Sequence, residues 1–423
     1  MTSTTPIHAG TSVEGNIADS LRRLLALDPG LLANPYPLYK EMRENAPVVR
    51  VGPQVLVSRY EDIKNVLRND RLFSSRRQSS SVVEARIAAL SPDELVKYEH
   101  IIGHDSNQLA LMDDPGHARL RNFVTETFSA KRIAEMRGVL SDISNELLDD
   151  IEARGLTRFD FIGDYSFHVP FRAICHILGV PREDSAKIRE WGLVLSAGLS
   201  TTYENLDEAF DALKNFSTYI EGLIAEARAN PDREDLVAQL VNAKDDEGVY
   251  LTDVELVAMF VQMLVSGNTN TLLANVMVAL AENPSERARL LETPELIRGS
   301  VDEFIRYASS IHAIRRTATE DTEIGGFPIR KHETLLLLLA SGNHDPEKFE
   351  NADVLDVTRK GARQHLGLGF GIHTCLGQWL LRLDAEVALA VLLERYPNIH
   401  LDGPVEYRQT FVQHGPERLY VAM

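Results

Sequence analysis

The segment between Thr252 and Pro284 constrains this chain more than any other, because it reads as one long buried helix. Thr252 and Glu255 have the spacing of a capping box, and Asn283-Pro284 marks the stop. About thirty mostly apolar residues lie between them, which gives a helix of roughly 45 Å at 1.5 Å per residue. A helix of that length predicts a protein built mainly of α-helices around one element that crosses the domain.

The centre of this helix contains residues that a buried helix disfavours. Residues 266–271 read SGNTNT, and Gly, Asn and Thr each cost up to about 1 kcal/mol relative to Ala in a helix. A tolerated kink, in which Thr bonds back to the backbone, is one interpretation. A functional groove at the midpoint is the other, because local conflicts in a sequence concentrate at functional sites.

The remaining pattern predicts a mainly α fold with small β-sheets, of the α+β class. From 115 to 230, apolar residues recur three or four apart, as on amphipathic helices. Residues 55–60 form one of several short β-rich runs near the start and towards the end. Residues 74–110 are polar and irregular around one or two helices, which is typical of a lid or binding loop. We expect residues 1–20 to be a flexible tail and residues 21–423 to form a single domain.

Charge and cysteine usage narrow the class of protein. The 423 residues include 62 acidic and 44 basic side chains, a formal net charge of -18. A nucleic-acid partner is not expected, because such proteins need clustered positive charge. No uninterrupted apolar run reaches about 18 residues, and the start lacks the features of a signal peptide, so we expect no membrane span. Two distant cysteines, Cys175 and Cys375, fit a reduced cytoplasmic setting.

Cys375 lies in the most unusual segment of the chain, HLGLGFGIHTCLG (365–377), just before a long apolar stretch. Gly367, Gly369 and Gly371 permit a tight turn and close approach of the backbone to a flat or bulky group. A cysteine at the start of a helix lies in the positive field of free N–H groups, which favours the thiolate. A buried inert cysteine and a redox thiol are the alternatives, although the glycine density argues against simple core packing.

This segment closely resembles the haem-binding loop of the cytochrome P-450 superfamily, in its soluble bacterial form. The family pattern Phe-Gly-x-Gly-x-His-x-Cys-x-Gly reads LGFGIHTCLG here (368–377), with Leu368 in place of the opening Phe. The resemblance implies the cytochrome P-450 fold, with the long central helix over the haem. It also implies heme b (iron protoporphyrin IX) as cofactor, Cys375 as the axial iron ligand, and Gly369 and Gly377 beside the cofactor. The family's aromatic residue shields the sulfur, so Leu368 implies an altered iron potential.

Further matches extend the resemblance from about residue 30 to the C-terminus. Glu303 and Arg306 match the family's Glu-x-x-Arg helix, and Arg359 matches the third member of a buried network under the haem. Such a network is costly to bury unless it is complete. The family contacts to the haem propionates fall on four residues: His117, Arg121, Arg316 and His373.

The resemblance implies a monooxygenase that inserts one oxygen atom from O2 into an organic substrate. Thiolate ligation favours O–O cleavage at haem iron. The chain contains nothing similar to a flavin or iron–sulfur domain, so the electrons must come from a separate ferredoxin and ferredoxin reductase. We expect a monomer whose cysteine side meets the acidic donor through Arg119, Lys131, Arg132, Lys360 and Arg363, for which ordinary solvated charge is the alternative.

The chain departs from the family at the centre of the long helix. The family carries Ala-Gly-x-Asp/Glu-Thr-Thr there, and the acid and first Thr deliver protons to dioxygen. Here Thr269 takes the place of the acid and Asn270 that of the alcohol, followed by Thr271. Thr and Asn can hold a water or donate a hydrogen bond but cannot relay a proton as a carboxylate does. The three residues remain the candidate catalytic group, with water, a substrate group or a shifted Asn270–Thr271 pair completing the relay.

The family's substrate-contacting segments combine apolar and polar side chains here. They suggest an apolar small molecule with some oxygen functions, such as a terpenoid, a steroid or another secondary metabolite. Core packing explains the apolar members equally well. The candidate pocket residues are Leu195, Leu264, Gly267, Ile311, Ile314 and Phe411.

Two other functions remain open. Loss of the acid is compatible with a peroxide-driven peroxygenase or with a reductase of a small oxidant that uses the same haem. A non-catalytic haem sensor is the alternative from another class of protein.

Overall fold

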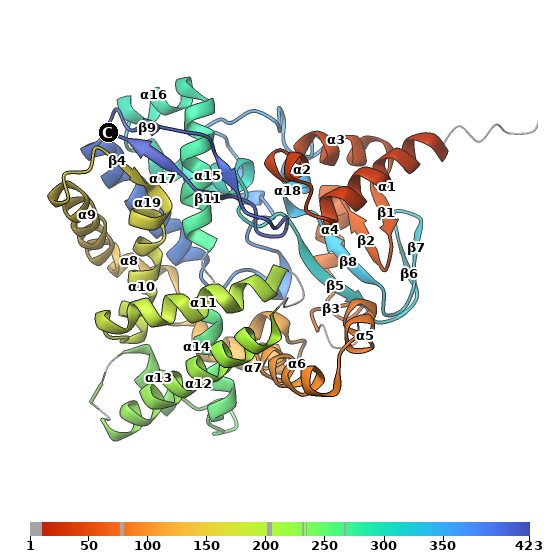
Figure 1. The fold of residues 1–423 in the computed structure, drawn as a ribbon, viewed down its shortest axis with the longest axis horizontal. Helices are drawn as coiled ribbons and strands as arrows, with labels where there is room; N and C mark the ends of the chain where they lie inside the picture. Colours follow the sequence, from red (N-terminus) through yellow and green to blue (C-terminus); the bar gives the residue numbers. More distant parts are fainter. Residues whose placement is uncertain (1–10, 77–79, 201–204, 231, 234, 266–267) are drawn as a thin grey trace, which may run out of the picture.

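The protein is described by a computed structural model over residues 11–76, 80–200, 205–230, 232–233, 235–265 and 268–423. Helices dominate, and the strands form small sheets, as the sequence predicts. Figure 1 shows the largest sheet on one side of the molecule, with α1 (Thr11–Leu25), α2 (Pro29–Ala33) and α3 (Tyr36–Asn45) against it and most other helices on the opposite side.

The largest sheet has the strand order β1-β2-β8-β5-β3. Strand β2 pairs in parallel with β8, and the other neighbours are antiparallel. The bounds are β1 (Val48–Val51), β2 (Gln54–Val57), β3 (Phe73–Ser74), β5 (Ile314–Ala318) and β8 (Thr334–Leu337). Smaller sheets join β4 (Arg158–Asp160), β12 (Tyr420–Ala422) and β9 (His400–Leu401), then β6 (Thr322–Ile324) with β7 (Phe327–Ile329), and β10 (Glu406–Tyr407) with β11 (Pro416–Arg418).

The expectation of a flexible tail over residues 1–20 is wrong for residues 11–20. They form most of α1, which packs on α3 and β1. Ile17, Leu21 and Leu24 are fully buried. Their spacing of four and three places them on one helical face, so burying that face holds the segment against the sheet.

The predicted long helix is present as α14 (Asp253–Val265) and α15 (Asn268–Glu282), and residues 266–267 between them lie outside the described part of the chain. The capping box is confirmed: the Thr252 N–H donates to Glu255 at 2.8 Å, and the Glu255 N–H donates to the Thr252 hydroxyl at 3.3 Å. The span from Asp253 to Glu282 is apolar and long enough to cross a membrane, but 75% of its most apolar window is buried inside the protein. Its hydrophobicity therefore fits a core helix.

The other helices surround this element. Residues 74–110 contain two helices, as expected, and α6 packs on α12 and α14. Helix α19 contacts α8, α9, α10, α15 and α17, so it lies at the centre of the helical body. The bounds are α4 (Tyr60–Arg68), α5 (Ser81–Ile87), α6 (Pro92–Asp105), α7 (Gly116–Thr125), α8 (Ala130–Glu135), α9 (Arg137–Ala153), α10 (His168–Leu178), α11 (Ser185–Ser200), α12 (Leu206–Ala229), α13 (Leu236–Asn242), α16 (Pro284–Glu292), α17 (Leu296–Tyr307), α18 (Leu339–Asn343) and α19 (Gln378–Arg395).

Replacing Leu21 by Ala tests whether α1 belongs to the folded core. We expect Leu21→Ala to lower the free energy of unfolding by about 2–5 kcal/mol, the usual cost of removing a buried Leu side chain. Chemical denaturation followed by circular dichroism measures the change. Arg22→Ala, on the exposed face of the same turn, is the control, and equal stability of the two variants would show that α1 is not held by its apolar face.

Candidate functional site

Cys375 is held in a tight loop between η5 (Gly371–His373) and α19. Its N–H donates to the Leu368 carbonyl at 2.9 Å, and the Gln378 N–H donates to its carbonyl at 3.3 Å. Gly371 has φ +74°, and a Cβ there would lie 2.7 Å from the Leu67 carbonyl oxygen. Only glycine fits both the left-handed backbone and this contact. The loop therefore presents the Cys375 side chain, which is half-buried, to a large cavity.

The environment of the Cys375 thiol opposes ionisation in one respect and favours it in others. Burial raises the pKa of Cys375, while the Gly377 N–H and the guanidinium groups of Arg121 and Arg382 lower that pKa. The backbone N–H field expected from the sequence is thus present, and burial is the largest of these influences. By contrast, burial alone raises the pKa of Cys175 to about 12, which fits an inert core thiol.

The four predicted propionate contacts line the same cavity as Cys375, Gly369 and Gly377. His117 and Arg121 come from α7, Arg316 from β5, and His373 from η5. The rings of His117 and His373 lie 4.3 Å apart between centroids, and Arg121 donates to the Thr374 carbonyl at 2.8 Å. Segments that are distant in sequence therefore bring two imidazoles and two guanidinium groups to one rim of the cavity.

These groups fit an anionic cofactor edge. Arg316 is 8% exposed, and no carboxylate among the described residues lies within ion-pair distance of it. Burial lowers the pKa of Arg316 to about 10, so the side chain stays cationic at neutral pH. The His117 Nε2 is buried without a hydrogen-bond partner, and the space where Gly377 would carry a Cβ is open. A buried unpaired cation is costly unless a ligand carries the opposite charge, so a flat group with carboxylates satisfies this site.

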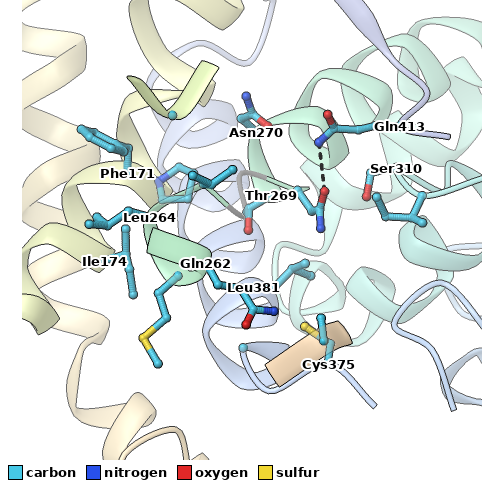
Figure 2. Close-up of a pocket in the computed structure, with 18 of the residues that line it drawn as sticks. Phe171, Ile174, Gln262, Leu264, Thr269, Asn270, Ser310, Cys375, Leu381 and Gln413 are labelled. Carbon is cyan, nitrogen blue, oxygen red and sulfur yellow. Dashed lines mark hydrogen bonds between the residues drawn. The ribbon is translucent and has the colours of Figure 1, made fainter. Parts of the chain in front are cut away.

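The cavity has a volume of about 1340 Å³. Figure 2 shows Cys375 on its lower side, Thr269 near the middle, and Phe171, Ile174 and Leu264 together on one flank. Ser310 and Gln413 lie on the opposite flank, where Gln413 donates to the Asn268 side-chain oxygen at 2.9 Å. An apolar wall thus faces a polar one across the cavity.

The three predicted catalytic residues do not all line the cavity. Thr269 and Asn270 line the cavity, but the Asn270 side-chain oxygen accepts hydrogen bonds from the Thr271 N–H at 2.6 Å and its hydroxyl at 3.1 Å. Thr271 is 1% exposed, does not line the cavity and packs against Gly415. Thr271 therefore does not face the cavity with Thr269 and Asn270, and its catalytic role stays a prediction.

The predicted substrate-pocket residues are only partly brought together. Leu264, Ile311 and Ile314 line the main cavity, whereas Leu195 lines an adjacent pocket of about 280 Å³ that shares Ile311 and Ile314 with it. The prediction that Phe411 lines the substrate pocket is wrong, because this side chain packs in the apolar cluster under α1 and α3. Gly267 lies outside the described residues. Several lining residues had no sequence signal, because only the tertiary fold gathers them: Phe171, Ile174, Asp384, Arg408, Gln409 and Thr410.

The predicted charge network is formed, with Glu303 and Arg306 fully buried and Arg359 partly buried. Arg306 donates to Glu303 at 2.7 and 2.8 Å, and Arg359 donates to Glu303 at 3.0 Å. Arg306 also donates to the Asn343 carbonyl at 2.8 Å, while the Asn343 side chain accepts from the Leu366 N–H at 2.7 Å. The network therefore ties α17 to the start of the cysteine loop.

The basic residues expected on the cysteine side differ in availability. Arg119 donates to Asp245 at 2.9 Å and to Glu255 at 2.6 Å, so its charge is neutralised within the protein. Lys131, Lys360 and Arg363 are exposed, and Arg132 is exposed but pairs with Glu126 at 3.3 Å.

Comparison with known proteins identifies the family to which this chain belongs. The family model described as Cytochrome P450 matches residues 47–413. The chain belongs to the cytochrome P450 family. Its cofactor is therefore haem b, and the protein is a haem-thiolate monooxygenase, an oxidoreductase.

The relatives are bacterial P450 enzymes matched over nearly their whole length. Mycinamicin IV hydroxylase/epoxidase of Micromonospora griseorubida is 34% identical over 90% of this chain and 94% of the relative. The polyketide biosynthesis cytochrome P450 PksS of Bacillus subtilis is 30% identical over 92% and 96%.

Solved structures show the same P450 fold. P450BioI in complex with an acyl carrier protein ligated to hexadec-9Z-enoic acid has a TM-score of 0.84 at 28% identity, over 94% of this chain and 100% of that chain. CYP109E1 of Bacillus megaterium in complex with testosterone has a TM-score of 0.81 at 29% identity, over 93% and 99%.

Replacing Glu303 by Gln tests the buried network. We expect Glu303→Gln to lower the free energy of unfolding by about 3–5 kcal/mol, because Arg306, which is 0% exposed, would keep its buried charge without a counter-ion. We also expect a lower haem-to-protein ratio after purification, because hydrogen bonds through Asn343 connect the cysteine loop to the same network. The exposed Glu320→Gln is the control, and a Glu303→Gln protein with normal haem content and stability contradicts the assignment.

Proposed function

We propose that the protein inserts one oxygen atom from O2 into a largely apolar organic molecule, with electrons from a separate ferredoxin and ferredoxin reductase. One observation supports this most: a single cavity of about 1340 Å³ contains Cys375, Thr269 and a long apolar wall. Pockets for small organic ligands usually measure about 300–1,000 Å³. The cavity therefore has room for a cofactor together with a substrate.

We assign the cofactor contacts to the residues at the cavity rim. Cys375 would bind the iron, and Arg121, Arg316, His117 and His373 would hold the propionates. Haem with a thiolate ligand supplies the capacity to cleave the O–O bond of dioxygen. The protein's own contribution is to hold the cofactor edge with buried donors and to exclude bulk water from the apolar wall.

The substrate class follows from the two flanks of the cavity. Phe171, Ile174 and Leu264 offer apolar surface, while Ser310 and the Gln413–Asn268 pair offer hydrogen bonds. This combination suits a terpenoid, a steroid or another secondary metabolite that carries a few oxygen atoms. The similarity to a mycinamicin IV hydroxylase/epoxidase and to a testosterone-bound structure supports the same class.

The electron donor would meet the exposed cations beside the cysteine loop. Lys131, Lys360 and Arg363 are exposed and could meet an acidic ferredoxin together with Arg132, which also pairs with Glu126. Opposite charge accelerates such encounters. A cytoplasmic monomer that meets the ferredoxin by diffusion is the simplest arrangement.

A second candidate function follows from Thr269 and Asn270. Neither side chain can relay a proton as a carboxylate does, and the Asn270 oxygen is already engaged by Thr271. A peroxygenase would receive its oxygen atom and protons together from peroxide, and a reductase of a small oxidant would also bypass the ordinary relay.

Ligand-induced change in the Soret band tests for an organic substrate. We expect terpenoids or steroids to shift the spin state of the purified holoprotein, because they displace water from the apolar side of the cavity. Spectral titration of a panel of such compounds measures the shift, and polar compounds of similar size are the control. If no apolar compound changes the spectrum, a haem sensor becomes the better explanation.

Any compound that binds can then be used to test whether the oxidant is O2 with two electrons or peroxide. We expect product with ferredoxin, ferredoxin reductase and NAD(P)H, and an oxygen atom in the product that derives from labelled O2. Peroxide without the redox proteins is the parallel reaction. Product with peroxide but none with the redox proteins would overturn the proposed monooxygenase function in favour of a peroxygenase.

A further inference from the structure

The loop that joins β10 to β11 near the C-terminus brings polar side chains into the cavity. Arg408, Thr410 and Gln413 of this loop all line it. The loop is held against the neighbouring chain, because the His414 N–H donates to the Ser310 carbonyl at 2.9 Å. Its polar side chains are therefore positioned by the fold before any ligand binds.

Arg408 is a half-buried cation without a carboxylate partner among the described residues. Its Nη1 donates to the Gln413 side-chain oxygen at 3.3 Å, whereas its Nε and Nη2 form no hydrogen bond with a described residue. Glu417 also lines the cavity, but this carboxylate is exposed and lies beyond ion-pair distance. Burial lowers the pKa of Arg408 and Glu417 raises it. Because a guanidinium stays protonated in proteins, the side chain is positively charged at neutral pH.

The Thr410 hydroxyl is a second donor that the protein leaves unused. Its oxygen is buried without a hydrogen-bond partner among the described residues, and the residue lines the same cavity. Burying a charge or a polar group without a partner is costly, so such groups usually have a functional explanation. A ligand group that is anionic and accepts hydrogen bonds would satisfy both Arg408 and Thr410.

The position of Arg408 relative to the apolar wall follows from its contact with Gln413. Gln413 lies on the flank of the cavity opposite Phe171 (Figure 2), and it donates to the Asn268 side-chain oxygen at 2.9 Å. Since Arg408 donates to Gln413, its guanidinium lies on the same polar flank. A cation and an apolar wall therefore face each other across one cavity.

The other cations that line the cavity in the described chain have different surroundings. Arg121 and Arg316 lie with the cofactor contacts, and Arg189 lies 4.4 Å from the centre of the Phe167 ring. Arg418 is exposed, and water screens the charge of such a group. The polar flank thus contains one half-buried cation that is available to a substrate.

We propose that Arg408 binds a carboxylate of the substrate, with the Thr410 hydroxyl as a second donor. The substrate is then an organic acid whose apolar body lies along the apolar wall and whose acidic end lies at the loop between β10 and β11. A guanidinium suits this group because two of its N–H donors match the two carboxylate oxygens. The inference deepens the proposed function and rests on it for the reaction. Arg408 determines specificity and takes no part in the oxygen chemistry.

The test measures the affinity of matched acids and amides by titration of the holoprotein, followed at the Soret band. The probes are lithocholic acid, dehydroabietic acid and dodecanoic acid, each compared with its own primary amide. The amide keeps the size and the apolar body and removes only the charge. We expect at least one acid to bind the wild type about 10- to 100-fold more tightly than its amide. A panel in which no acid binds more tightly than its amide overturns the inference.

Substitution of Arg408 separates charge recognition from a structural role. In Arg408→Gln, the affinity for the acid should fall about 10- to 100-fold, to the level of the amide, while the affinity for the amide stays the same. Arg408→Lys should keep part of the preference, because it retains the charge but loses the two-donor geometry. Equal weakening of acid and amide in Arg408→Gln would show a structural defect and overturns the inference.

Two other variants serve as matched controls. Arg418→Gln removes an exposed cation from the strand that follows the same loop, and Arg189→Gln removes the cation beside Phe167. Both should keep the acid-to-amide preference of the wild type within about threefold, as expected for a screened charge or one held elsewhere. A preference that is lost in either control, or that survives in Arg408→Gln, overturns the assignment to Arg408.

Failure of this inference and failure of the proposed function are distinct. The titrations require no turnover, so they decide the role of Arg408 even in a protein that oxidises nothing. A wild type that oxidises neither acids nor neutral compounds that bind, when supplied with the redox proteins, overturns the proposed function. A wild type that oxidises neutral compounds but shows no preference for acids overturns this inference alone.

Discussion

The buried ion pair between Glu303 and Arg306 is the contact on which the functional part of the structure depends. Both side chains are almost completely inaccessible, so neither charge is solvated if the other is lost. Arg306 also bonds the backbone of the 343–354 region through three carbonyl groups. Since Asn343 in turn holds the Leu366 N–H, the position of the cysteine loop is set by a charge pair on a different helix.

The two sides of the cavity differ in polarity and charge. The cysteine side is rich in fixed hydrogen-bond donors, and its buried cation Arg316 has no carboxylate partner among the described residues. That side is complete only with an anionic group bound. The opposite side is largely apolar, and its polar atoms include those of Thr269 and of the Gln413–Asn268 pair. Specific chemistry of this protein is therefore expected from the second side, because the first is common to the family.

Local motifs were predictable, whereas long-range packing was less so. The Thr252–Glu255 capping box and the Glu303–Arg306 pair depend on residues three positions apart, and both are formed. Thr271 and Phe411 were misplaced because the direction of a side chain depends on what packs against each face, here Gly415 and the cluster under α1. The ion pairs of Arg119 were not predictable for the same reason, since Asp245 and Glu255 approach it only in the folded chain.

The sequence by itself determined the mainly helical fold, the glycine-rich cysteine loop and the set of donors around it, because each is encoded by spacing within a short segment or by a motif. It also showed that the usual acid is absent at Thr269. Only the tertiary structure decided which polar groups share the cavity with that position. Asp384 enters the site because α19 packs against α15 and α10, and no periodicity along α19 distinguishes an acid that faces a cavity from one that faces solvent.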